Sequence, residues 1–141
     1  MTTFIYGILE SVGFTHPLHP AATHIPMGMV MGCFFFGLIA WYFNKQDLRK
    51  TALHCSVLAL IFIFPTIIAG ILDWQYFYGG TYQPLIVIKM VLAAVLVILL
   101  GLSIKMNRGG TDPKTLFIVY VFCLVCATGL GFSGGELVYG G

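Results

Sequence analysis

Charged residues are scarce in this 141-residue chain: they make up 9% of it, whereas 59% of its residues are hydrophobic. Soluble domains carry about 25% charged residues, so this composition excludes a water-soluble globular domain. The net charge of +2 is too small to indicate a nucleic-acid partner. Residues 1–23 also lack a basic n-region and a small-residue cleavage site, and we therefore expect no signal peptide. A polytopic membrane protein is the class that remains.

Several chemical signatures are missing as well. No C-x-x-C-H sequence is present, which excludes covalently attached c-type haem. The absence of a metalloprotease motif and of a nucleophile–base pair ranks hydrolysis last. Cys33, Cys55, Cys123 and Cys126 fall in apolar runs, where a thiol is usually a small hydrophobe. We do not expect the chain to be an enzyme by itself, although it could serve as a redox subunit.

Long apolar runs, in contrast, are abundant. Each is near the ~20 residues that a helix needs to cross a bilayer. They cover about residues 24–43, 51–72, 83–104 and 115–132. Together they predict an all-α fold, a single membrane domain over residues 1–141 built as an antiparallel bundle of four transmembrane helices.

The chain before the first span has two parts. Apolar residues recur there at helical spacing, which predicts a short amphipathic helix lying in the membrane interface; they are Phe4, Ile5, Ile8, Leu9 and Val12. Residues 16–26 follow, with three of the four histidines and three of the six prolines. Because proline disfavours helix in the residue before it, we expect a stiff, non-helical segment leading into the membrane. Residues 1–23 are thus predicted to be an interfacial helix and a His/Pro-rich lead-in.

Basic residues are distributed unevenly among the expected loops. Residues 44–50 and 105–114 hold six of the seven lysines and arginines, and the loop at residues 73–82 and both termini hold none. Basic loops face the cytoplasm in most membrane proteins. We therefore expect a multi-pass protein of the bacterial inner membrane with both termini on the outer, periplasmic side.

This topology gathers most of the ionisable side chains at one membrane face. The candidate cofactor-binding residues there are His16, His19, His24, Asp73, Lys89 and Glu136. Lys89 lies about six residues into its span, roughly 9 Å deep, where a lysine is costly without a partner. A cluster that only closes the helix ends is the simpler interpretation. His54 lies 19 residues before Asp73 on the same run, roughly 28 Å away, and is excluded from the cluster.

A metal site is a second possibility for the same residues. His19 and His24 are the candidate metal ligands, with His16 and an acid as further donors. Histidine with carboxylate favours zinc, and added methionine favours copper. Met27 and Met31 follow His24 on one helical stripe, although such methionines more often fill the core. Gly28 and Gly32 form a small-xxx-small pair that predicts close helix contact.

Three short motifs occur near the ends of the expected spans: residues 19–26 read HPAATHIP, residues 70–74 read GILDW, and residues 134–140 read GGELVYG. Together they resemble the bacterial membrane family called domain of unknown function 2231, whose signature is HPxxxHxP. Many members carry a further histidine near the start of the third helix, where this chain has Lys89. The family's relatives often neighbour or are fused to iron–sulfur and cytochrome domains. The resemblance therefore implies membrane electron transfer, with haem b as the implied cofactor.

Three hypotheses for function follow. The first is a small membrane subunit of a respiratory or electron-transfer assembly, in which the cluster ligates haem b or contacts quinone. The second is a non-catalytic accessory subunit that docks partner helices, such as those of cytochrome subunits. The third is a copper- or zinc-binding membrane protein. Under all three hypotheses the protein lies in the lipid bilayer and has lipid as a partner.

Overall fold

The computed structural model describes residues 2–139, with side chains as far as Glu136. Within this range the chain forms α-helices and no strand. The helices are α1 (Thr2–Ser11), α2 (Leu18–Tyr42), α3 (Gln46–Phe77), α4 (Pro84–Arg108) and α5 (Pro113–Tyr139). The all-α prediction is confirmed.

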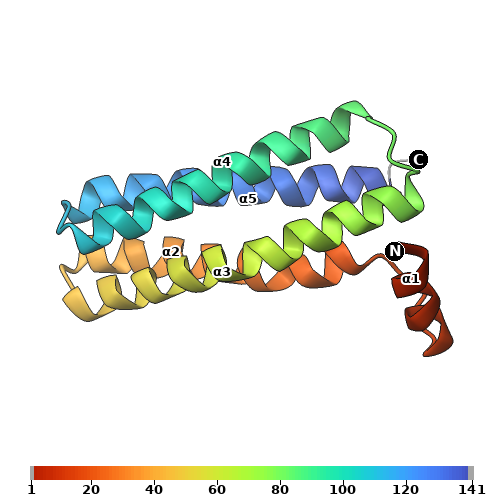
Figure 1. The fold of residues 1–141 in the computed structure, drawn as a ribbon. Helices are drawn as coiled ribbons and strands as arrows, with labels where there is room; N and C mark the ends of the chain where they lie inside the picture. Colours follow the sequence, from red (N-terminus) through yellow and green to blue (C-terminus); the bar gives the residue numbers. More distant parts are fainter. Residues whose placement is uncertain (1, 140–141) are drawn as a thin grey trace.

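Helices α2 to α5 form an antiparallel four-helix bundle, and α1 lies across one end of it (Figure 1). Each long helix packs on two neighbours: α2 on α3 and α5, and α4 on α3 and α5. We call the two ends of the bundle the α1 end and the basic end. The basic end carries the α2–α3 and α4–α5 loops, and the α1 end carries α1 and the α3–α4 loop.

Four helices are long and apolar enough to cross a membrane, as the sequence predicts. They run Leu18–Tyr42, Gln46–Phe77, Pro84–Arg108 and Pro113–Glu136. Helices α2, α3 and α5 begin before the expected spans, and α3, α4 and α5 continue past the expected ends. The helix expected to be the shortest is among the longer ones, since α5 has 27 residues and α2 has 25.

The expected non-helical segment before the first span is wrong from residue 18 onward. Pro17 is the N-cap of α2, with φ −56° and ψ 139°, and the helix begins at Leu18. Pro20 falls in the first turn, where a backbone N–H would have no partner inside the helix. Proline there costs no hydrogen bond, so the helix tolerates it.

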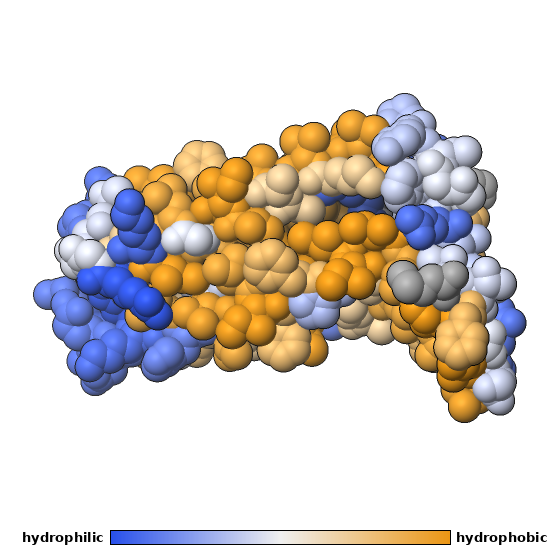
Figure 2. Space-filling view, in the orientation of Figure 1, coloured by the Kyte–Doolittle hydropathy of each residue, from blue (hydrophilic) through white to orange (hydrophobic). Residues whose placement is uncertain are grey.

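Small and aliphatic side chains fill the centre of the bundle. The buried cluster there consists of Val30, Ala59, Ile63, Leu96, Leu100, Cys123, Cys126 and Ala127. The outward faces are also apolar, as with Phe35, Ile98 and Phe122, which are 53%, 68% and 58% exposed. Hydrophilic residues gather at the two ends and leave a hydrophobic belt between them (Figure 2). Lipid is the environment that such a surface fits.

Candidate functional site

Asp73 is the centre of the polar contacts at the α1 end. Its side chain is 5% exposed and accepts hydrogen bonds from the backbone N–H groups of Leu18 at 3.0 Å and His19 at 2.8 Å. The Tyr6 hydroxyl of α1 also donates to it. The first N–H groups of a helix lack partners within that helix and attract negative charge. Asp73 of α3 therefore caps α2 from outside.

The His19 ring is held in one orientation against α3. Its Nδ1 lies 2.9 Å from the carbonyl oxygen of Thr66. Because a carbonyl only accepts hydrogen bonds, Nδ1 donates the proton of this bond, and in the neutral ring Nε2 carries the lone pair. A methyl group on Gly70 would lie 2.9 Å from Nδ1, so the ring needs glycine at that position. His19 is thus a fixed imidazole with one nitrogen unused.

Thr66 also donates a hydrogen bond to a backbone carbonyl of α2 that a proline leaves without its usual partner. Pro26 lies inside α2 and has no N–H, so the carbonyl of Ala22 loses its usual partner four residues on. The Thr66 hydroxyl lies 3.1 Å from that carbonyl and 2.8 Å from the carbonyl of Phe62. Its single proton serves one of the two at a time. Thr66 therefore links α3 to α2 at two residues, His19 through its carbonyl and Ala22 through its hydroxyl.

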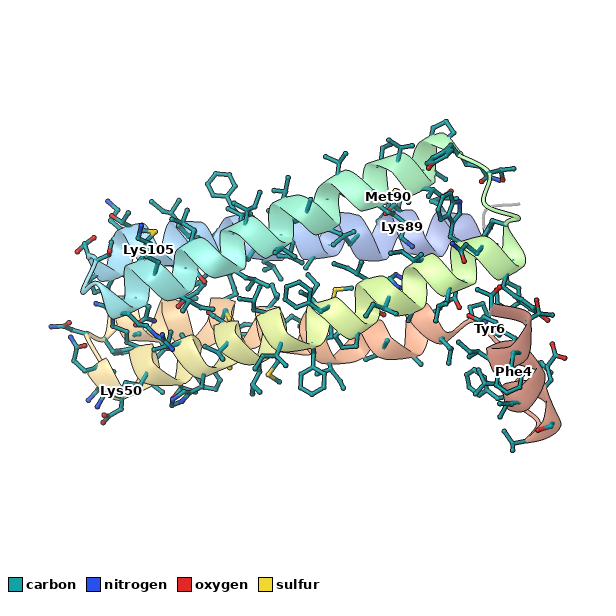
Figure 3. The ribbon with its side chains drawn as sticks, in the orientation of Figure 1. Phe4, Tyr6, Lys50, Lys89, Met90 and Lys105 are labelled. Carbon is teal, nitrogen blue, oxygen red and sulfur yellow. The ribbon has the colours of Figure 1, made fainter. Side chains whose placement is uncertain are left out.

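Lys89 enters the same region from α4. Its side chain is half-buried and points toward the interior of the bundle (Figure 3). The ammonium would lie 3.5 Å from a methyl group placed on Gly134 of α5. It interacts electrostatically with Asp73 and His19, yet no carboxylate of the described residues pairs with it directly. Lys89 is thus a hydrogen-bond donor without a carboxylate partner among the described residues, at the same end of the bundle as His19.

The remaining candidates lie on the surface. His24 is exposed on α2, five residues and about 140° around the helix from His19. His16 is exposed in the α1–α2 linker, where its ring makes an edge contact with Phe14 at 6.3 Å. Glu136 is exposed near the end of α5, and His54 is exposed on α3 toward the basic end. The structure thus brings together His19, Asp73 and Lys89.

The described part of the chain contains no group of side chains that could bind a metal ion by itself. No three His, Cys, Asp or Glu side chains there are grouped so that they could hold one ion. His19 and His24 point to different sides of α2, so a metal on one would take its other ligands from elsewhere.

Tyr6 is a site residue that the sequence analysis missed. It is 2% exposed, whereas Phe4, Ile8 and Val12 are 73%, 51% and 75% exposed. Three residues of the predicted apolar stripe therefore face outward and Ile5 and Leu9 are partly buried, while Tyr6 faces α3, stacked on Tyr76 at 4.2 Å. Burial, and then the hydrogen bond to Asp73, raise the pKa of Tyr6 above its usual value. Tyr6 follows Phe4 by two residues, about 200° around the helix, so the apolar periodicity gave no signal for it.

A second buried polar group, also missed, lies toward the basic end. Asn107 donates at 3.1 Å both to the Arg49 carbonyl and to the Tyr120 hydroxyl. Ser56 and Cys33 lie further inside, 3.3 Å apart. The apolar cluster of the bundle centre separates these groups from the site around His19. The described residues therefore form two polar sites and no continuous polar path between them.

The fold and these sites define a class: a small four-helix membrane protein with a capped, histidine-containing cluster at one end. Residues 15–141 match the family described as "Predicted membrane protein (DUF2231)". The chain belongs to that family, in agreement with the resemblance of its motifs. Comparisons with curated proteins and with solved structures gave no significant match.

Proposed function

We propose that this protein is a small integral membrane subunit of a respiratory or electron-transfer assembly and that the site around His19 receives a quinol. One observation carries the proposal: the Thr66 carbonyl orients the His19 ring and leaves Nε2 without a partner among the described residues, at the end of the bundle where Lys89 points inward. A proton acceptor and a hydrogen-bond donor at one place suit a molecule that presents a hydroxyl and a carbonyl in turn.

The chemistry assigns a different role to each side chain. Oxidation of a quinol to a quinone releases two protons with the two electrons: the Nε2 atom of His19 accepts the proton of one hydroxyl, and the proton of the other hydroxyl passes to water at the α1 end. Lys89 donates a hydrogen bond to the quinone oxygen that forms. The two electrons of the oxidation go to a redox partner protein of the assembly. Asp73 stays occupied with the N-terminus of α2 and keeps the histidine in place.

Depth in the bilayer supports the same assignment. Lys89 lies in the second turn of α4, within the candidate span and close to its end. Quinone head groups move at that level, between the acyl chains and the interface. If the basic loops face the cytoplasm of the bacterial inner membrane, as their charge predicts, the proton is released toward the periplasm.

Haem b is a second candidate, and the orientation of His19 also favours it. Histidines that bind metals usually donate their other ring N–H to a carbonyl or carboxylate, as His19 does to Thr66. His19 would hold the haem iron through its Nε2 atom, and Lys89 would pair with a propionate. A partner protein or a second copy would supply any further histidine, because His24 points elsewhere.

The test uses the purified chain in native lipid with a photoreactive short-chain quinone. His19→Ala and Lys89→Gln should each lower specific labelling at least about tenfold, the effect expected for loss of a charge-assisted hydrogen bond. His24→Ala and His54→Ala are matched controls, since both remove an exposed histidine and should label like the wild type. Lys89→Gln keeps the test informative if His19→Ala fails to fold.

A reduced-minus-oxidised spectrum of the same samples decides between the two cofactors. A haem band that disappears in His19→Ala, with no quinone labelling, favours haem b over quinol. Labelling that depends on His24 as much as on His19 would refute both assignments. Absence of both signals would leave the accessory role of docking partner helices.

A further inference from the structure

The basic end of the bundle contains a recess that the proposed function does not use. Its volume is about 470 Å³, and it lies between the start of α3 and the end of α4. The residues that line it are Gln46, Arg49, Lys50, Leu53, Asn107 and Gly110. Two cations and two side-chain amides thus surround one opening, and no acid lines it.

Arg49 is fixed in this recess by one neighbour. Its Nε lies 3.3 Å from the Asn107 side-chain oxygen, and its Nη2 lies 3.1 Å from the Asn107 carbonyl. Asn107 is 8% exposed and is itself held by the Tyr120 hydroxyl at 3.1 Å. The guanidinium is therefore positioned before any ligand arrives, and its Nη1 donors remain unused. It also covers a carbonyl of the last turn of α4, which would otherwise repel an anion.

Lys50 adds a mobile positive charge at the rim. Among the residues that the structure describes, no partner is found for its ammonium, and the side chain is exposed (Figure 3). Nearby Asp112 is occupied by the start of α5, where it accepts from the N–H groups of Lys114 and Thr115 at 3.2 and 3.3 Å. Neither Asp112 nor Asp47 lines the recess, so Arg49 and Lys50 are the charged side chains that a ligand meets there.

The position of the recess decides what kind of anion reaches it. Leu53 lies one turn further along α3 from Lys50, and the exposed side chains of Leu58 and Ile61 continue the same helix into the hydrophobic belt (Figure 2). A ligand with a charged head and an apolar tail would contact both parts. Basic pockets at the ends of transmembrane helices bind the head groups of anionic lipids by the same combination.

We propose that this recess binds a phosphate group, carried by the head group of an anionic phospholipid. The Arg49 guanidinium and the Lys50 ammonium contact the phosphate oxygens. The Gln46 amide donates to a neighbouring oxygen, and the acyl chains lie along α3. The bound lipid then bridges α3 and α4, which pack on each other at this end of the bundle.

The experiment measures lipid retained by the delipidated, purified chain by native mass spectrometry, with phosphatidylglycerol and phosphatidylcholine compared at equal concentration. We expect preferential retention of phosphatidylglycerol. Lys50→Gln should weaken it about fivefold, the value that corresponds to one basic contact with an anionic lipid. Lys50→Gln leaves the Arg49–Asn107 bonds intact, so the bundle should fold.

Lys114→Gln is the matched control, because it removes the same charge at the same end without lining the recess. An equal loss in Lys114→Gln and Lys50→Gln would show diffuse surface attraction and overturn the proposal. Equal retention of phosphatidylcholine would overturn it too. A third arm adds inorganic phosphate at constant ionic strength: displacement of the lipid by millimolar phosphate would assign the recess to the free anion and refute the lipid as its carrier.

Discussion

Asp73 joins three helices through one carboxylate. It accepts from Tyr6 of α1 and from the first backbone N–H groups of α2, and it belongs to α3 itself. A cap of this kind contributes about 0.5–2 kcal/mol when its partner is in the same helix. Here it also fixes where α2 starts, and therefore where His19 lies. Tyr6 is the member of this group that lies outside the membrane-spanning helices.

The raised pKa of Tyr6 predicts a pH limit for the docking of α1. Below the usual tyrosine pKa of 10.0, Tyr6 is protonated whether α1 is docked or free, so its full contribution to docking is present. Above that value a free Tyr6 releases its proton first, and docking weakens as the pH rises toward the raised pKa. Tyrosinate absorbance should therefore show a late-titrating component to which Tyr6 contributes.

Tyr6→Phe should reduce this late component, whereas Tyr82→Phe, which changes a tyrosine that is 74% exposed, should leave it intact. Titration curves with the same late component in wild type and Tyr6→Phe would contradict the prediction.

At the level of helices, glycine positions decide how closely the elements approach. The two glycines of the predicted pair, Gly28 and Gly32, have different surroundings. Nothing lies within 4 Å of a methyl group placed on Gly28, whereas a methyl group on Gly32 would lie 3.0 Å from the Cys55 sulfur. The closest approach occurs at Gly37, where such a methyl group would lie 2.5 Å from the Tyr120 ring. Spacing along the chain does not reveal which glycine faces a neighbour.

Gly37→Ala should therefore destabilise the bundle by about 1–3 kcal/mol, because the Tyr120 ring has to move and its hydrogen bond with Asn107 is strained. Gly28→Ala is the matched control on the same helix and should be neutral or slightly stabilising, since alanine favours helix over glycine. Thermal unfolding in detergent, followed by size-exclusion chromatography, measures both. Equal midpoints for the two variants would show that α2 and α5 do not pack as described.

At the scale of the whole molecule, charge and polarity are divided between the two ends. The basic end holds all the lysines and arginines except Lys89, and the α1 end holds Asp73, Glu10 and Glu136. The apolar cluster of the centre separates the two polar sites. Each site can therefore be altered without disturbing the other, which is what the two proposals require.

The division of charge also predicts how the bundle is inserted. Tyr82→Cys places a label site in the α3–α4 loop at the α1 end, and Lys114→Cys places one at the basic end. A membrane-impermeant maleimide should label Tyr82→Cys in intact spheroplasts and Lys114→Cys only after permeabilisation. The native cysteines give little background, because Cys33, Cys123 and Cys126 are buried and Cys55 is partly buried. The reverse labelling pattern would invert the topology.

The sequence by itself determined the four membrane helices, the antiparallel bundle and the family, because each is written in local hydrophobicity, loop length and short motifs. It also predicted that Asp73, Lys89 and the histidines lie toward one end. Which histidine joins Asp73 was decided only by the tertiary structure. The direction of a side chain around a helix depends on where that helix starts and on what it packs against. The cap from Asp73, the space left by Gly70 and the Thr66 carbonyl come from a different helix and fix His19, while His24 is left on the surface.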